Sequence, residues 1–207
     1  MARSVSGVGY RSAGTVLALA GLATGFAGYR RWHLRWGATD DEVRAPMPGD
    51  DLLDGAQFCA TRALTIDAPP AQVWPWLVQV GIGRAGFYAY DLLDNKGRPS
   101  ADQVLPEWQH PHLGDQVAPM TEPANDQTSF RLAQLDEPEV LVWAKTDSTW
   151  SWRLTPVDAG RTRLVTRLKQ RYDWTNPAVF MTLPLLELGD FPMMHRMLLG
   201  VRERAER

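Results

Sequence analysis

Three side chains able to transfer protons, those of Tyr90, Asp91 and His195, stand out in this sequence. A phenol, a carboxyl group or an imidazole in an apolar cavity can act as a general acid or base. Tyr90 and Asp91 also fit capping and hydrogen bonding around the turn that follows them, and His195 also fits an exposed or satisfied histidine. No spacing places a nucleophile beside a base, so these three are catalytic candidates without a recognisable triad.

Two histidines, His110 and His112, form the H-x-H pattern that metal sites use. The pattern lies in a loop around Pro111, and the spacing fixes no third or fourth ligand. Solvated histidines explain the pattern better, so the sequence predicts no metal site.

Gly81, Gly83 and Gly86 spell G-x-G-x-x-G, the fingerprint of dinucleotide-binding proteins. That fingerprint requires a preceding strand and a βαβ unit. Here the preceding segment reads as a helix, and the following half of the chain has an antiparallel pattern. We therefore expect the glycines to turn the chain between two helices, and we predict no cofactor.

Aromatic and sulfur-containing side chains suggest an apolar pocket. Trp150 and Trp152 point to the same side of one predicted strand, and Trp143 on the preceding strand can meet them across the sheet. Core packing explains these residues as well as cavity lining does. The candidate ligand-binding residues are Tyr88, Trp108, Trp143, Trp150, Trp152, Met194 and Met197.

The elements that would position these residues follow from periodicity. Residues 61–86 read as a half-buried strand, a helix beginning at Pro69–Pro70 and a glycine-rich turn. A second short helix is expected over 87–94, and the apolar pattern after Pro184 predicts a long helix beginning near Asp190. Further strands are expected at 115–120, 129–135, 140–146, 149–157 and 162–172.

Short connections between these strands force antiparallel neighbours, so the predicted class is α+β. In the last strand, Leu164, Thr166 and Leu168 share one face, while Arg163 and Arg167 lie on the other. This pattern predicts a sheet with one covered face and one solvated face.

The segments 65–95, PEWQ (106–109), GDQV (114–117), WSWRL (150–154) and MLLGVRERAE (197–206) resemble the SRPBCC superfamily, which includes START-like and polyketide cyclase-type proteins. The most similar branch is a bacterial group described as polyketide cyclase/dehydrase-like. The resemblance extends from about Trp32 to the C-terminus. It implies a helix-grip fold, in which an antiparallel sheet wraps a long C-terminal helix around a hydrophobic cavity. Because the superfamily contains enzymes and carriers, it does not imply one chemistry.

The N-terminal part differs in charge from the rest. Residues 1–36 hold five arginines and no acid, so the remainder carries a net charge of −7 against −2 for the whole chain. Such an acidic body disfavours a nucleic-acid partner. Cys59 is the only cysteine, which excludes an intramolecular disulfide.

Eighteen uncharged residues, 12–29, predict a marginally apolar membrane helix, with Trp32 and Trp36 as its interfacial flank. A cleaved signal peptide and a disordered or surface-lying N-terminus are the alternatives. The basic flank predicts a single-pass protein of the cell membrane with its main domain in the cytoplasm. The expected organisation is an anchor (1–36), an acidic linker (37–60) and a helix-grip domain (61–207). In the linker, Thr39 and Glu42 have the spacing of a capping box, which predicts a short helix beginning near Thr39.

We expect a membrane-anchored protein that binds or transfers a hydrophobic small molecule, lipid or polyketide-like, in an internal cavity. The alternatives are a cyclase or dehydratase that uses the same cavity, and a structural protein whose cavity its own side chains fill.

Overall fold

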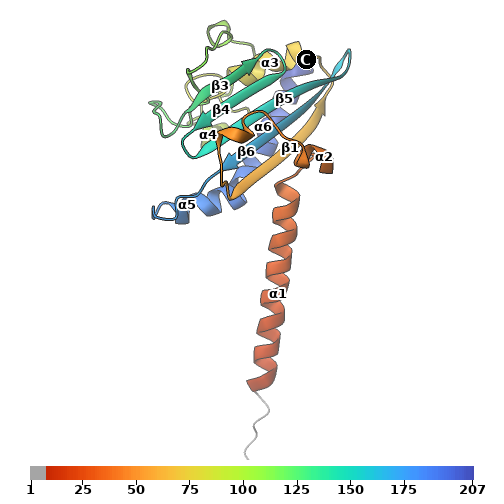
Figure 1. The fold of residues 1–207 in the computed structure, drawn as a ribbon, viewed down its shortest axis with the longest axis vertical. Helices are drawn as coiled ribbons and strands as arrows, with labels where there is room; N and C mark the ends of the chain where they lie inside the picture. The colour runs from red at the N-terminus through yellow and green to blue at the C-terminus, as the bar shows by residue number, and fades with distance from the viewer. Residues whose placement is uncertain (1–7) are drawn as a thin grey trace, which may run out of the picture.

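The computed structural model describes residues 8–207, and it contains one antiparallel sheet whose inner face carries the long C-terminal helix (Figure 1). Residues 1–7 of the predicted anchor, and the side chains of residues 8–14 and Val16, lie outside the described part. The strands are β1 (Phe58–Ile66), β2 (Gln116–Val117), β3 (Phe130–Asp136), β4 (Val140–Lys145), β5 (Ser148–Asp158) and β6 (Arg161–Gln170). All of the strands expected from the sequence form. The strand expected at 115–120 is the exception in length, because β2 has only two residues.

The strand order is β1-β6-β5-β4-β3-β2, so the first and last strands of the chain are neighbours. Leu64 of β1 lies opposite Leu164 of β6, which in turn lies opposite Leu154 of β5. Short hairpins connect β3 to β6 in sequence, as the turn residues predict. The predicted α+β class is confirmed, and the arrangement is compatible with a helix-grip fold.

Two helices cover the inner face of the sheet: α3 packs against α6, and both contact strands of the sheet. Pro70 is the first residue of α3. Proline suits this position, because a backbone N–H in the first turn has no acceptor within the helix, so nothing is lost by its absence. The long C-terminal helix begins at Asp190, as predicted. The helical segments are α1 (Val8–His33), α2 (Asp40–Arg44), η1 (Asp50–Leu52), α3 (Pro70–Val78), α4 (Asp91–Asp94), η2 (Pro106–Trp108), α5 (Val179–Pro184), the π-helix η3 (Leu185–Gly189) and α6 (Asp190–Ala205).

Indole rings dominate the core between the sheet and these helices. Trp143 lies directly opposite Trp150, with ring centroids 5.1 Å apart and nearly perpendicular planes. Trp152 contacts both rings, at 5.6 and 5.0 Å. Edge-to-face and tilted contacts at these distances are favourable for aromatic pairs. Met194 and Met197 of α6 belong to the same buried cluster.

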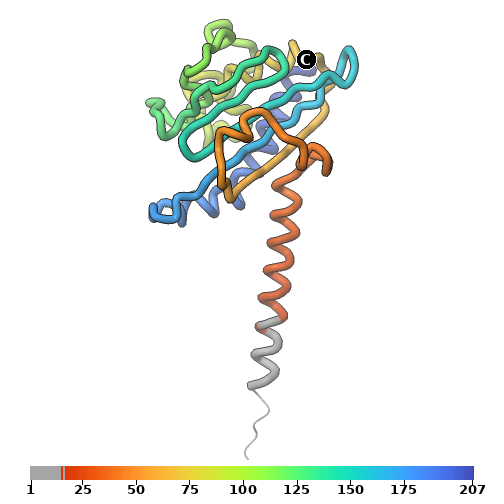
Figure 2. Tube along the Cα trace, in the orientation of Figure 1, coloured from red at the N-terminus to blue at the C-terminus, as the bar shows by residue number. Residues whose placement is uncertain are grey.

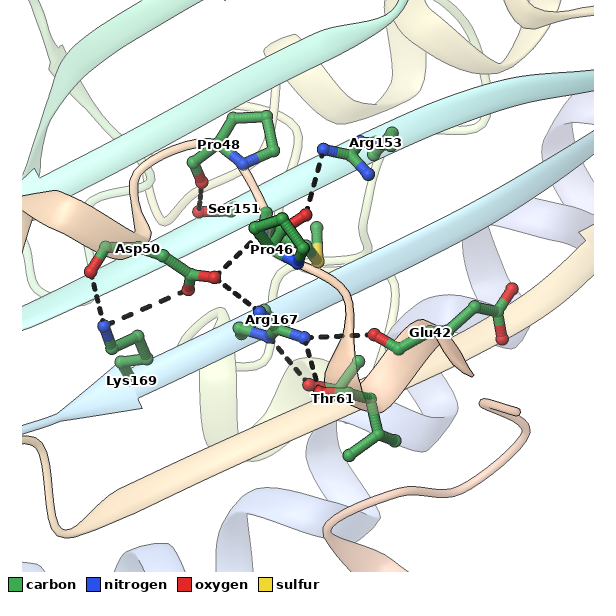
Figure 3. Close-up of polar contacts among 11 residues, drawn as sticks. Glu42, Pro46, Pro48, Asp50, Thr61, Ser151, Arg153, Arg167 and Lys169 are labelled. Atoms are coloured by element: carbon green, nitrogen blue, oxygen red, sulfur yellow. Dashed lines mark hydrogen bonds and ion pairs between the residues drawn. The ribbon is translucent and has the colours of Figure 1, made fainter. Parts of the chain in front are cut away.

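The outer face of the sheet is covered as well, which corrects the prediction of a solvated face. Residues 37–55, part of the expected acidic linker, lie across this face as a strap (Figure 3). Arg167 of β6 binds Asp50 and donates to the backbone carbonyl of Glu42, while Arg163 pairs with the Glu42 carboxylate at 2.7 Å. The periodicity of β6 indicates which residues face outward, but it does not show that a distant acidic segment neutralises them.

The strap contains a helix cap that the sequence predicts. Thr39 and Glu42 form the expected capping box at the start of α2, in which each side chain binds the other residue's backbone N–H. This cap orients the Glu42 carboxylate, which also accepts from Arg163.

The second short helix is shorter than predicted, because α4 begins only at Asp91. Gly86 and Tyr88 have φ values of 75° and 57°, so the chain before Asp91 adopts left-handed rather than helical geometry. The backbone of Tyr88 packs directly on α6: a Cβ atom added to Gly200 would lie 2.3 Å from the Tyr88 carbonyl oxygen.

The helix α1 projects away from the domain (Figure 2). Its side chains Leu17, Leu19, Leu22 and Phe26 are exposed. In the described part of the chain, no helix combines the length and the apolarity needed to cross a membrane.

At its other end, α1 continues into the edge of the sheet. The backbone carbonyls of Leu34 and Trp36 accept hydrogen bonds from Thr61 and Ala63 of β1. The Arg62 Nε atom donates to the His33 carbonyl at 2.8 Å.

Candidate functional site

A hollow of about 250 Å³ lies where the glycine-rich turn, the η2 loop and β2 meet. Its volume is a little below the ~300–1,000 Å³ typical of pockets for drug-sized ligands. The hollow is lined by Arg84, Glu107, Trp108, His110, Pro111, Asp115, Gln116 and Val117, and we call it the Arg84 pocket.

The glycine-rich turn positions Arg84. Gly81 and Gly86 form an isolated antiparallel bridge, and Arg84 lies between them. Gly81 has a φ of 134°, and a Cβ atom there would lie 2.3 Å from the Pro119 ring. The glycines therefore turn the chain after α3 and bring Arg84 to the pocket. The wholly antiparallel sheet contains no βαβ unit that a dinucleotide site would need.

Arg84 carries a positive charge that is incompletely satisfied. Its Nη2 atom donates to the Val78 carbonyl at 3.0 Å, whereas Nε and Nη1 are buried without a hydrogen-bond partner in the described part of the protein. The guanidinium carbon lies 4.3 Å from the centroid of the Trp108 ring, in a cation–π contact. Burial lowers the pKa of Arg84 to about 10, despite the opposing effects of Tyr88 and Asp115. A partly buried cation with buried, unpartnered donors favours a bound anion.

Gln79 fixes the loop that carries Trp108. Its Oε1 atom accepts hydrogen bonds from the Leu105 N–H at 2.9 Å and from Gln109 Nε2 at 3.0 Å. Its Nε2 atom donates to the hydroxyl of Tyr88 at 2.9 Å. Gln79 is fully buried, so these bonds hold the η2 loop against α3 and place the indole over Arg84.

The remaining charged groups of the pocket are exposed. Glu107, His110 and Asp115 are open to solvent, which screens their charges more strongly than that of Arg84. His112, the second member of the H-x-H pair, does not line the pocket; its Nδ1 atom lies 3.7 Å from Asp115. The site thus combines one partly buried indole face with one partly buried cation.

The predicted ligand-binding residues fall into two groups. Trp108 lines the Arg84 pocket, whereas Trp143, Trp150, Trp152, Met194 and Met197 are buried in the core cluster. A second, smaller hollow of about 90 Å³ is lined by residues around Tyr172 and by none of this second group. Ligand binding by the core group stays a prediction.

Tyr88, the other predicted ligand-binding residue, is buried next to the pocket. Its hydroxyl donates to the Trp76 carbonyl at 3.0 Å and accepts from Gln79. Burial raises the pKa of Tyr88 well above its ordinary value. The phenol therefore stays protonated and supports the loop.

The three catalytic candidates do not come together. The Tyr90 side chain is exposed, and the Asp91 carboxylate accepts from the Ser100 hydroxyl. The His195 ring packs against Trp36 with centroids 4.4 Å apart, and burial lowers the pKa of His195. Among the described residues, no hydrogen bond or ion pair connects His195 with Tyr90 or Asp91. Their catalytic role stays a prediction.

Arg84 and Gln79 are the site residues that our sequence analysis missed. A usable signal was present, because Arg84 is the only charged residue between Asp67 and Asp91. A single charge within a long apolar stretch is unusual unless it meets a partner or a ligand. Gln79 has no comparable signal, since its role depends on a loop about 25 residues further along the chain.

Comparison with known proteins gives a likeness in fold only. No family model matches the chain, and neither does any curated protein. Among solved structures, the KanY protein has a TM-score of 0.44 at 12% identity, covering 72% of this chain and 97% of that one. A protein from Thermobifida fusca has a TM-score of 0.43 at 18% identity, with 71% and 92% covered. Protein NE0264 from Nitrosomonas europaea has a TM-score of 0.42 at 15% identity, with 70% and 92% covered. Similarity at this level decides nothing about function.

Proposed function

We propose that this protein is a membrane-attached binding protein for a small hydrophobic molecule with an acidic group, which occupies the Arg84 pocket. The observation that carries the proposal is Arg84 itself: a partly buried arginine, stacked on an indole at the wall of a 250 Å³ hollow, whose Nε and Nη1 atoms are buried and have no hydrogen-bond partner among the described residues.

The chemistry of the pocket supports this ligand class. The Trp108 ring favours a flat or aliphatic body, while Arg84 favours a carboxylate or another anion. A bound anion offsets the cost of keeping the guanidinium out of water. The resemblance to the SRPBCC superfamily agrees with a hydrophobic ligand.

Membrane attachment is the second part of the proposal. It is supported by the projecting helix α1, whose apolar side chains Leu17, Leu22 and Phe26 are exposed, and by the tryptophan and arginines at its end. Poorly soluble acids partition into bilayers, so attachment raises their concentration near the pocket. In this proposal the main domain lies on the cytoplasmic side.

The test uses 2-naphthoate, a planar aromatic carboxylate, and its neutral analogue 2-naphthamide. Calorimetric titration of the full-length protein is expected to show tighter binding of the carboxylate. Replacing Arg84 by Gln removes the charge and is expected to weaken 2-naphthoate binding by about tenfold or more, because hydrogen bonds to charged groups contribute ~1.5–3 kcal/mol. The same substitution is expected to leave 2-naphthamide binding nearly unchanged.

Two variants serve as controls. Arg98→Gln removes an exposed arginine that pairs with Glu122, outside the pocket, and Trp174→Ala removes an exposed indole elsewhere. Both are expected to bind 2-naphthoate normally, whereas Trp108→Ala weakens both ligands. Equal binding of carboxylate and amide by the unmodified protein would refute the anion-binding proposal.

A further inference from the structure

The segment between β6 and α6 exposes an unusual amount of apolar surface. Trp174, Phe180, Met181, Leu185 and Leu188 are all more than half exposed, and Phe180 reaches 80%. Single exposed apolar residues are common, but five within fifteen positions form a patch that needs a partner. We call these five residues the α5 patch.

The inner side of the same segment is also apolar. Val179 is buried, and Leu183 and Leu186 pack against the cluster of Phe58 and Tyr172. A helical segment that is apolar on all sides is typical of one that is buried, either in a protein core or in a membrane. Here one side is buried by the domain, while the described chain leaves the other side uncovered.

The only charged residue between Asp173 and Asp190 is turned away from the surface. Glu187 lies in the π-helix η3, is 8% exposed, and pairs with Arg30 of α1 through two hydrogen bonds of 2.7 and 3.0 Å. The ion pair removes the charge from the α5 patch and connects the segment to α1. π-Helical turns occur often at functional sites.

The α5 patch lies at the end of the domain from which α1 projects (Figure 1). At the same junction, Trp32 is half-exposed and packs against Phe191, and Arg31 is exposed. Tryptophan and arginine beside an apolar surface are typical of a membrane–water interface with anionic headgroups. The α5 segment and the flank of Trp32 and Arg31 thus lie at the same end of the domain, and the Arg30–Glu187 ion pair links them.

We infer that the α5 patch inserts into the headgroup region of a bilayer and forms a second membrane contact beside α1. The inference rests on the membrane attachment proposed above and adds the surface that meets the lipid. Two elements joined by the Arg30–Glu187 pair then enter the membrane side by side, as interfacial helices do.

A fluorescent label reports the depth of the patch. In a Cys59→Ser background, the full-length chain receives a single cysteine by Phe180→Cys or, as a control, by Leu92→Cys, and each is labelled with the dye NBD. Leu92 is 82% exposed, so it matches Phe180 in exposure. It lies in α4, away from α5: Tyr88, shortly before α4, packs on the C-terminal half of α6, whereas α5 precedes the N-terminal end of α6. With phosphatidylcholine–phosphatidylglycerol vesicles, the emission at position 180 should shift to the blue and be quenched by nitroxide-labelled lipids. The emission at position 92 should not change.

Vesicle flotation of the full-length chain measures the contribution of the patch. The double substitution Phe180→Ser/Leu185→Ser is expected to lower the partition coefficient by at least about tenfold, given the transfer free energy of large apolar side chains. The matched control Leu92→Ser/Leu93→Ser removes two equally exposed residues and should have no effect. Circular dichroism verifies that both variants fold.

The outcomes separate the two proposals. A protein that floats with vesicles while the label at position 180 stays in water overturns the insertion of the patch and leaves the attachment standing. A protein that does not float overturns both. A blue shift that appears without vesicles and grows with protein concentration identifies a second copy as the cover and overturns the inference.

Discussion

The two faces of the sheet are both covered, but by different means. The inner face is covered by α3 and α6 through a continuous apolar cluster in which Trp143, Trp150 and Trp152 touch one another. The outer face is covered by the 37–55 strap, which makes ion pairs and hydrogen bonds to Arg167 (Figure 3) and to Arg163. The inner face depends on close packing of large aromatic side chains, whereas the outer face combines charged contacts with a small apolar cluster of Met47, Ala63 and Val165.

This difference bears on where a ligand binds. The indoles of the inner face pack edge to face or tilted on one another, and their one buried unpartnered group among the described residues, Trp152 Nε1, is neutral. Arg84 lies outside this cluster, and its two unpartnered nitrogens, Nε and Nη1, belong to a charged group that lines a hollow. An aromatic-rich surface is therefore a weaker indicator of a ligand than a partly buried charge with unpartnered donors. The predictions below test how far the two faces differ.

The largest effect is expected on the inner face. Trp143→Ala is expected to lower the free energy of unfolding by about 3–5 kcal/mol, as large-to-small changes of buried aromatic residues do. Urea denaturation measures the change, and Trp174→Ala, at an exposed indole, is expected to cost less than about 0.5 kcal/mol. A small cost for Trp143→Ala would mean that the inner face is not closely packed and would reopen it as a ligand cavity.

A smaller and more local effect is expected on the outer face. Arg167 is 6% exposed and binds Asp50, Thr61 and the carbonyls of Glu42 and Val43. Arg167→Met removes these hydrogen bonds and is expected to lower the free energy of unfolding by roughly 1–3 kcal/mol. Hydrogen exchange should speed up mainly in residues 40–50.

The matched control for this variant is Arg153→Met. Arg153 is an outward arginine of β5 that makes one hydrogen bond, of 3.4 Å, to the Pro46 carbonyl. Its substitution is expected to change the free energy of unfolding by less than about 0.5 kcal/mol. Equal changes in the free energy of unfolding at both positions would show that the hydrogen bonds of Arg167 do not hold the strap in particular.

The smallest effect is a pH dependence of the strap. The hydrogen bond from Arg163 lowers the pKa of Glu42 below its ordinary value of 4.5. Because the folded-state pKa is the lower one, the pair stabilises the strap above pH 4.5, and this contribution disappears as the pH falls through the folded-state value. Hydrogen exchange in residues 37–45 should therefore rise below that pH. Glu42→Gln should show faster exchange at neutral pH and a flatter pH profile; an unchanged profile would contradict the role of the pair.

Local patterns predicted the elements well. The alternation in β3 to β6, the Thr39–Glu42 capping box and the start of α6 at Asp190 are all confirmed, because each depends on neighbours in the chain. The covered outer face and the hydrogen bonds of Gln79 depend on contacts between distant segments, which periodicity does not encode. The turn before α4 was also missed, because the left-handed φ of Tyr88 depends on its packing against Gly200.

The junction between α1 and the sheet is rigid, because it contains no flexible linker. The carbonyls of His33, Leu34 and Trp36 are all held by β1, so helix and sheet share one hydrogen-bond network. Helix and domain therefore move as one rigid body, so a tilt of α1 rotates the whole domain by the same angle. The inclination of this single helix thus determines the direction in which the mouth of the Arg84 pocket faces.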